Sequence, residues 1–420
     1  MHDDTIQLRQ PAFDLASLRA WVGPVMAAFG EDFTDVELEH ARLRIEPERL
    51  IGAVDGETWV GAGGADSLRL TVPGGGEVGA AGITMIGVSP SHRRRGILRQ
   101  MMGWLFDQAR ERGEPVAILW ASEGAIYQHF GYGIGTLQGT FEIERGRARF
   151  ARPAEPLGRI RLVDRDEAMG LIPPLYEALR SGTPGSVGRD DTLWRHSLLD
   201  DAEWMRHGNG RKFLAVLEVD GVVRGYAIYR IKSEWDERGP NNTLLALEVL
   251  GLDAAAERAV WEWLFGVDLV TRVKGWRAPV AHPLLLQLTE PRRLGLTVRD
   301  GLWLRLIDMP AALAARSYNG SGSVTFELTD AFCPSNAGRW RLDVADGAVP
   351  GDRGVATVTT FTGDPDLTLD TSDLAAAYLG AFSFADLAHA GRVGECRPGA
   401  VATADALFAT AGAPWCSTMF

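Results

Sequence analysis

One stretch constrains the fold of this chain more than any other: an apolar run that leads through a basic turn into a helical pattern. Residues 82–88 (Gly-Ile-Thr-Met-Ile-Gly-Val) have the composition of a buried strand. Apolar residues recur at helical spacing from Ile97 to Ala109, and Gly113 closes the pattern. The turn between the two contains Arg93, Arg94, Arg95 and Gly96. The sequence therefore predicts a strand, a basic turn and a helix in immediate succession.

Such a turn can bind phosphate, because the first N–H groups of a helix lack intrahelical acceptors and lie at its positive end. The guanidinium groups at 93–95 add forked donors that suit phosphate oxygens. The turn lacks both the Gly-x-Gly-x-x-Gly of dinucleotide folds and the Gly-Lys-Ser/Thr of a P-loop. We therefore expect a polyphosphate cofactor held at its pyrophosphate. The alternative is an arginine cluster that only solvates a loop beside an amphipathic helix.

Composition limits the class of protein. A chain of 420 residues is long enough for two or three domains. The net charge of −12 argues against a nucleic-acid partner and favours a cationic amine, although it could also serve only solubility. No apolar run approaches the length of a membrane span, and the N-terminus lacks the pattern of a signal peptide. We expect a cytoplasmic protein.

Cysteines and histidines give no sign of a metal site. The three cysteines are odd in number and lack metal-ligand spacing, and the eight histidines form no His-x-x-x-His pair. The sequence therefore predicts no disulfide framework and no metal catalysis.

The chain divides into three segments, approximately 1–150, 158–300 and 301–420. The first contains a helical pattern, a hairpin with a turn at Asp55-Gly56, the strand and helix described above, and a strand at 115–121. The second repeats this order, with a hairpin turn at Asp220-Gly221, a strand at 244–252, a helix at 254–265 and a strand at 267–273. The two turns are 165 positions apart, which predicts two copies of one fold.

The second copy differs where the first is basic. Residues 253–258 read Asp-Ala-Ala-Ala-Glu-Arg, which places carboxylates where the pyrophosphate would bind. We therefore expect no cofactor there. The third segment has a helix at 310–318, four short strands between 324 and 369, and helices from Asp373, an α+β pattern.

The turn resembles the Arg/Gln-x-x-Gly-x-Gly/Ala loop of the GNAT acyl-CoA-dependent N-acetyltransferases, although Leu98 replaces the usual small sixth residue. Three features together resemble the Eis (enhanced intracellular survival) acetyltransferases within that class. They are Val-x-Pro-x-His-Arg-Arg-Arg-Gly-x-Leu-Arg at 88–99, Ala-Ser-Glu-Gly-x-Ile-Tyr-x-x-Phe-Gly-Tyr at 121–132, and a chain that ends in Phe420.

This resemblance implies a mixed α/β architecture of two tandem GNAT-like domains, the second degenerate, followed by a sterol-carrier-protein-like α+β domain. It also implies acetyl-CoA as co-substrate, direct acetyl transfer in a ternary complex, and a homohexamer. The acceptor would be an aminoglycoside or polyamine-like amine, or a lysine side chain. A related lipid-binding domain could imply a lipid pocket in the third segment, but nothing in the sequence demands one.

The resemblance also implies the cofactor site. In GNAT folds the fourth strand splays, which here would expose residues 86–88, with the Val88 N–H as donor to the oxyanion. The alternative is a plain buried strand, although Gly87 weakens it as a strand and fits a bulge or the close approach of a ligand. The expected cofactor-binding residues are Ile86, Gly87, Val88, Arg93, Arg94, Arg95, Gly96, Ile97, Leu98, Arg99, Ser122 and Glu123.

Two proton-handling groups complete the expected site. A phenol with a pKa near 10 is protonated at neutral pH and can donate a proton to a thiolate. Chemistry alone does not decide whether Tyr127 or Tyr132 is this acid. The Eis pattern assigns the general acid to Tyr127. Ser122 and Glu123 could also simply cap the short helix that carries it. No histidine stands out as a base, and the resemblance implies the C-terminal carboxylate of Phe420.

Most chain ends are frayed and solvated, but residues 413–420 are apolar and contain no charged side chain, which indicates a packed tail. A different class of function also fits the sequence. The chain could bind or sense acyl-CoA or lipid with a vestigial GNAT core, although a sensor would have no need of the acid at Tyr127.

Overall fold

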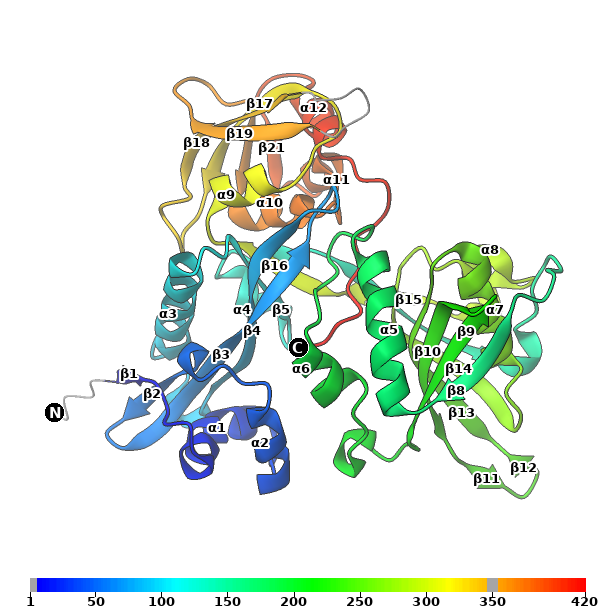
Figure 1. Cartoon of the computed structure of the whole chain (residues 1–420). Helices are drawn as coiled ribbons and strands as arrows, with labels where there is room; N and C mark the ends of the chain where they lie inside the picture. The colour runs from blue at the N-terminus through cyan, green and yellow to red at the C-terminus, as the bar shows by residue number, and fades with distance from the viewer. Residues whose placement is uncertain (1–5, 346–353) are drawn as a thin grey trace. The chain divides into compact units, whose positions relative to one another are not determined.

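The computed structural model describes residues 6–345 and 354–420, and their contacts form two compact units (Figure 1). The first unit holds the chain up to Thr136, Leu302–Pro414 and Thr418–Phe420. The second holds Leu137–Gly301 and Trp415–Ser417. Residues 137–150, which we expected in the first segment, therefore belong to the second unit.

A seven-stranded sheet forms the centre of the first unit, in the order β1-β2-β3-β4-β5-β16-β6. All its pairs are antiparallel except β4–β5. Its strands are β1 (Gln7–Arg9), β2 (Ile51–Asp55), β3 (Thr58–Thr71), β4 (Glu77–Val88), β5 (Val116–Trp120), β6 (Gly133–Ile134) and β16 (Leu302–Leu306). The predicted hairpin is β2–β3, and the predicted strand at 82–88 is the second half of a longer strand.

Helices cover both faces of this sheet. A side chain at Gly61 would meet Ile97 and Met101 of α3, whereas one at Gly87 would meet Val25 of α1. Because Gly61 pairs with Val88, the residue after Gly87, these glycines point to opposite faces. Thus α1 and α3 pack on opposite sides. The helices of this part are α1 (Leu15–Phe29), α2 (Asp35–Arg42), α3 (Ile97–Glu111) and the short α4 (Gly124–Gln128).

Strand β4 carries a bulge and then separates from β5. In its pairing with β3, Thr84 faces Gly64 and Gly87 faces Ala62, so Met85 and Ile86 together oppose one residue. Met85 adopts a φ of 55°. The parallel pairing with β5 runs only from Ala80↔Val116 to Gly82↔Ile118, although both strands continue beyond it. The sheet therefore forks after Gly82.

The structure corrects our interpretation of Gly87. We expected this glycine to permit a bulge or the approach of a ligand, but the bulge lies at the two preceding residues. A Cβ at Gly87 would lie 2.6 Å from the Cα of Val25. The glycine is therefore required because the backbone of α1 packs directly against β4.

The second unit contains a seven-stranded sheet in the order β15-β7-β14-β13-β10-β9-β8. Helices α5 (Arg165–Arg180) and α7 (Ala254–Phe265) pack in two separate hydrophobic clusters of this unit. The strands are β7 (Leu137–Glu144), β8 (Arg159–Val163), β9 (Lys212–Val219), β10 (Val222–Lys232), β13 (Asn242–Gly251), β14 (Val270–Ala278) and β15 (Thr297–Asp300).

The two sheets have the same order, which confirms the predicted duplication. We count the strands of one sheet from β1 and those of the other from β8. In each sheet the first four strands are antiparallel, the fourth pairs in parallel with the fifth (β4–β5 or β13–β14), and two further strands follow. The sixth position of each sheet, however, is filled from outside its own segment. Strand β7 leaves the first segment to pair with β14, and β16 follows the second segment but pairs with β5.

The third segment forms a smaller sheet in the order β19-β18-β17-β20-β21 within the first unit. Its strands are β17 (Gly322–Thr329), β18 (Gly338–Ala345), β19 (Val355–Thr360), β20 (Leu367–Asp370) and β21 (Val393–Glu395). Its helices are α9 (Met309–Ala315), α10 (Thr371–Tyr378), α11 (Phe384–His389) and α12 (Ala400–Phe408). Helix α9 is shorter than predicted, because Arg316 is extended and donates to the carbonyls of Tyr378 and Phe408.

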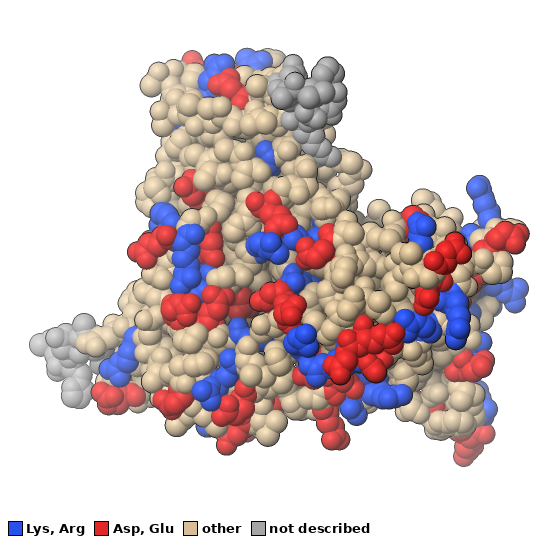
Figure 2. Space-filling view, viewed as in Figure 1, with Lys and Arg blue, Asp and Glu red and all other residues tan. Residues whose placement is uncertain are grey.

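In the part of the chain that the structure describes, no helix combines the length and apolar character that crossing a membrane requires. On the face shown in Figure 2, acidic and basic side chains are interspersed, and no single-sign patch dominates it.

Candidate active site

A cavity of about 680 Å³ opens between strand β4, the turn after it, and helix α4. It is lined by the bulge of β4, by the basic turn and by the first residues of α3. The expected site residues that line it are Ile86, Val88, Arg93, Arg94, Gly96, Ile97, Leu98, Arg99, Ser122, Glu123 and Tyr127. Two segments that the sequence joined only by resemblance, 86–99 and 122–127, thus meet at one cavity.

Four lining residues were missed: Ala28, Phe29, His92 and Ile126. His92 and Ile126 lie inside the quoted motifs, so closer attention to those motifs could have included them. Ala28 and Phe29 end α1, and no local pattern places the end of that helix beside the turn.

The N-terminus of α3 presents backbone donors to this cavity. Gly96 is its N-cap with a φ of 80°, and within the described chain no side chain caps it. The first helical hydrogen bond runs from the Gln100 N–H to the Gly96 carbonyl, so the N–H groups of residues 97–99 have no acceptor within the helix. Arg94 also adopts a positive φ of 64°. The turn thus has the backbone geometry that was expected of it, and phosphate binding stays a prediction.

Two of the expected cofactor-binding residues do not line the cavity. Gly87 faces α1, as described above. The Arg95 guanidinium lies 3.6 Å from an Asp55 carboxylate oxygen, which is also 3.2 Å from Nε2 of His92. Arg95 thus pairs with the β2–β3 turn, and the structure places Arg93 and Arg94 at the cavity instead.

Tyr127 and Tyr132 have different positions. Tyr127 lines the cavity, whereas Tyr132 is fully buried behind it, with the two ring centroids 5.9 Å apart. Burial raises the pKa of the Tyr127 phenol, a hydrogen bond with Ser122 opposes the shift, and the Glu123 charge adds to it. Among described atoms, the Tyr132 hydroxyl has no hydrogen-bond partner. Only Tyr127 is therefore placed to meet a ligand in this cavity.

Helix α4 is not capped in the way we considered. Its N-cap is Glu123, and among the residues described no side chain forms a capping hydrogen bond there. The Ser122 side chain instead interacts with the Tyr127 phenol. The capping interpretation of Ser122 and Glu123 is therefore wrong.

The end of the chain is packed, as its apolar composition predicts. Thr418 is buried, and its carbonyl accepts a hydrogen bond of 3.1 Å from the Trp120 indole of β5. A Cβ at Gly82 would lie 3.1 Å from the Phe420 ring, so this ring contacts β4 at its last residue paired with β5. The final residues of the chain thus lie at the fork of the first sheet.

The corresponding turn in the second unit is closed by its own side chain. Asp253 caps α7 and accepts hydrogen bonds of 3.0 and 2.8 Å from the N–H groups of Ala255 and Ala256. These bonds and the neighbouring Arg224 hold the pKa of this carboxyl below its ordinary value. Donors that would bind a phosphate in the first copy are occupied here.

Family models match three parts of the chain. Residues 14–135 and residues 185–306 each match a model described as an acetyltransferase (GNAT) domain. Residues 309–417 match the sterol carrier protein domain. The predicted succession of two GNAT domains and a sterol-carrier-like domain is thereby confirmed.

Whole-chain relatives agree. An uncharacterized N-acetyltransferase of Streptomyces avermitilis is 40% identical over 417 residues, which cover 99% of each chain. N-acetyltransferase Eis of Mycobacterium tuberculosis is 35% identical over 350 residues, 81% of each chain. The crystal structure of Eis1 from Mycobacterium abscessus superimposes with a TM-score of 0.82 at 32% identity, covering 99% of this chain and 100% of that one. The chain therefore belongs to the Eis family of GNAT N-acetyltransferases.

Proposed function

We propose that this enzyme transfers the acetyl group of acetyl-CoA directly to a primary amine in a ternary complex. One observation carries the proposal: the uncapped N-terminus of α3 and the Tyr127 phenol line the same cavity. The first suits a pyrophosphate and the second suits a departing thiolate. GNAT acetyltransferases use acetyl-CoA, which supplies both groups.

The pyrophosphate would be bound by the N–H groups at the start of α3 and by the guanidinium groups of Arg93 and Arg94. The acyl arm would then extend toward the bulge of β4, where Val88 lines the cavity. Its N–H would donate to the carbonyl oxygen as negative charge develops there.

In the reaction, the amine nitrogen attacks the thioester carbonyl and forms the C–N bond. The tetrahedral oxyanion collapses, the C–S bond breaks, and the thiolate takes the proton of the Tyr127 phenol. The amine proton passes to the Phe420 carboxylate, which we propose as the general base. The Phe420 ring contacts β4 at Gly82, where the pairing with β5 ends and the two strands begin to separate, and this position supports the role.

Direct transfer needs no covalent enzyme intermediate. Among the described residues that line the cavity there is no cysteine, so none of them could form a thioester intermediate with the acetyl group. We expect initial rates to depend on both substrates in the pattern of a ternary complex, and no acetylated enzyme after incubation with acetyl-CoA alone.

The proposed acceptor is an aminoglycoside or polyamine-like molecule, or a lysine side chain. The net charge of −12 supports a cationic acceptor, because an acidic surface raises the local concentration of cations. Release of free thiol from acetyl-CoA with a panel of such amines tests the activity. A non-catalytic acyl-CoA sensor would release none. The homohexamer and the cytoplasmic location implied by the family stay predictions, the first open to sedimentation analysis.

Replacing Gly96 should block cofactor binding. A valine there is strained at a φ of 80°. Among the described residues, and apart from its chain neighbours, no atom lies within 4 Å of a Cβ at this position, so the side chain would occupy the space proposed for the pyrophosphate. We expect Gly96→Val to raise the apparent KM for acetyl-CoA far more than that for the amine. Arg94→Ala should weaken binding more mildly, by about 10- to 100-fold for one charge-assisted hydrogen bond. Unchanged coenzyme A binding by calorimetry in Gly96→Val would contradict the assignment.

Titration should give one coenzyme A per chain. The second copy of the fold has its α7 donors occupied by Asp253, so only the first copy is open. In the Gly96→Val variant the measured stoichiometry should fall toward zero, because no second site remains. A stoichiometry of two in the unmodified protein would show that the second copy also binds.

A further inference from the structure

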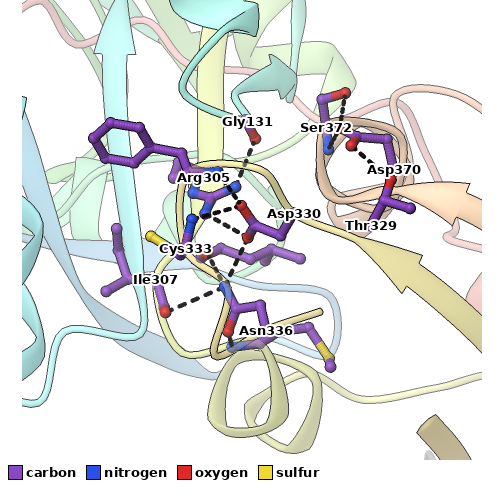
Figure 3. Close-up of polar contacts among 12 residues, drawn as sticks. Gly131, Arg305, Ile307, Thr329, Asp330, Cys333, Asn336, Asp370 and Ser372 are labelled. Carbon is purple, nitrogen blue, oxygen red and sulfur yellow. Dashed lines mark hydrogen bonds and ion pairs between the residues drawn. The ribbon is translucent and has the colours of Figure 1, made fainter. Parts of the chain in front are cut away.

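A buried ion pair joins β16 of the first sheet to the turn after β17, in the sterol-carrier-like segment, within the first unit (Figure 3). Arg305 on β16 is fully buried and donates from Nη2 to Oδ2 of Asp330, in the turn after β17, at 2.5 Å. Its Nη1 lies 3.4 Å from the Gly131 carbonyl oxygen, which accepts a second hydrogen bond. Figure 3 shows the guanidinium between these two partners.

Gly131 ends the segment that carries Tyr127. The N–H of Gly131 donates to the Gln128 carbonyl, and the N–H groups of Phe130 and Tyr132 both donate to the Tyr127 carbonyl. The guanidinium therefore holds the turn that follows α4, through its backbone. A glycine is needed there, because a Cβ would overlap Nη1 of Arg305.

Arg305 also belongs to the strand that fixes both ends of this segment. Strand β16 pairs with β5, which leads into α4, and with β6, which follows it. Leu304 lies opposite Ile118 on one side and Gly133 on the other. Movement of Arg305 would therefore shift the strands that flank residues 121–132 at both ends.

Asp330 is itself firmly held. Its Oδ1 accepts hydrogen bonds from the N–H groups of Phe332 and Cys333, and its Oδ2 accepts one from Asn336 Nδ2 at 3.2 Å. The carboxylate thus receives three bonds from its own turn in addition to that from Arg305. Such a preorganised acceptor fixes the position of the arginine.

The same turn contacts both α3 and the segment that follows α4. The Phe332 ring packs edge-to-face on Phe130, after α4, with centroids 5.0 Å apart, and on Phe106 of α3 at 5.4 Å. The Arg99 guanidinium, from the cofactor helix, lies 4.9 Å from the centroid of the same ring. Residues 330–336 therefore connect the helix of the phosphate-binding turn with the segment of the acid.

We infer that Arg305 and Asp330 are a positioning pair that orients Tyr127 toward the thioester, so that the sterol-carrier-like segment sets turnover in the GNAT domain. This inference rests on the proposed role of Tyr127 as general acid. It assigns to the third segment a mechanical part in catalysis that does not depend on any lipid.

Arg305→Lys tests the pair, because lysine keeps the charge but cannot reach Gly131 and Asp330 together with a planar fork. Arg49→Lys is the matched control. Arg49 is also buried in the first unit, where it binds both oxygens of Glu114 at 2.5 and 2.7 Å, and it does not line the cavity. Both variants should melt at lower temperature. Only Arg305→Lys should lose kcat, by about 10- to 100-fold as expected for a small misplacement of a catalytic group, with the KM for acetyl-CoA little changed.

A double-mutant cycle with Tyr127→Phe separates positioning from general loss of structure. If Arg305 acts through Tyr127, Arg305→Lys should lower kcat in the unmodified enzyme but have little further effect when Tyr127 is already phenylalanine. If Arg305→Lys does not fold, the pair Arg305→Met with Asp330→Asn leaves no unpaired buried charge and enters the same cycle.

Each outcome decides a different point. Equal kcat values in Arg305→Lys and Arg49→Lys, or additive losses in the cycle, would overturn the positioning role while leaving Tyr127 as the acid. A Tyr127→Phe enzyme with normal kcat would overturn the proposed acid, and the inference with it.

Discussion

Replacing Tyr127 by phenylalanine should lower turnover by about two to four orders of magnitude, the usual contribution of a general acid. The phenol is the proposed proton donor to the thiolate, and it lines the cavity beside Ser122. Phenylalanine keeps the ring, so the edge-to-face contact with Tyr132 at 5.9 Å should persist. Steady-state kcat, with coenzyme A binding measured by calorimetry, separates loss of chemistry from loss of binding.

Tyr132→Phe is the matched control for this variant. Tyr132 is fully buried, does not line the cavity, and within the described residues its hydroxyl has no hydrogen-bond partner. Its removal should leave kcat nearly unchanged and could raise stability, because an unsatisfied buried hydroxyl is unfavourable. If kcat fell strongly in Tyr132→Phe and stayed normal in Tyr127→Phe, the general acid would be Tyr132 and not Tyr127.

The pH dependence of kcat gives a further check on Tyr127. Burial raises the pKa of this phenol above its ordinary value near 10. An acid must be protonated to act, so a raised pKa keeps it active to higher pH. The alkaline decline of kcat due to this group should therefore have its midpoint above about pH 10, and it should be absent from the residual activity of Tyr127→Phe. A decline due to Tyr127 that sets in near neutral pH would contradict the role.

Local features of the fold were predictable because they depend on short-range patterns. Helix α7 was predicted at 254–265 and has those bounds, since its apolar spacing is regular and Asp253 is a strong N-cap. The hairpins at Asp55-Gly56 and Asp220-Gly221 followed from their turn residues.

The exchange of β7 and β16 between the two sheets was not predictable. A strand pattern shows which face is buried but does not encode the partner strand. Residues 137–144 are as compatible with β5 as with β14, and only the three-dimensional pairing with β14 decides. For this reason the boundary expected at residue 150 lies too far along the chain, because the second unit begins at Leu137.

The candidate site was predictable only where it is contiguous in sequence. The turn at 93–99 carries its chemistry in adjacent residues, so the motif and the cavity largely agree. Arg305 offered no comparable signal. It lies more than 170 positions from Gly131, in a strand that looks like any other apolar segment, and its role depends on a pairing that the sequence does not show.

Adding a short Gly-Ser extension after Phe420 should abolish activity, leaving less than about 1% of kcat if the carboxylate is the general base. The extension moves the negative charge away from the fork, where the Phe420 ring contacts Gly82. The same extension at the N-terminus is the control for an added tail. Deleting the last residues is a poorer test, because Trp415 donates to the Arg277 carbonyl and its loss would disturb the second unit.

A C-terminal amide, introduced by semisynthesis, isolates the charge from the shape of the tail. It keeps the Phe420 ring and the hydrogen bond between Trp120 and the Thr418 carbonyl, but it removes the proton acceptor. The amidated enzyme should therefore lose as much kcat as the extended enzyme. Its melting temperature and its affinity for coenzyme A should equal those of the unmodified enzyme. Full activity of the amide would mean that the base lies elsewhere, and that the tail contributes to the fork only by packing.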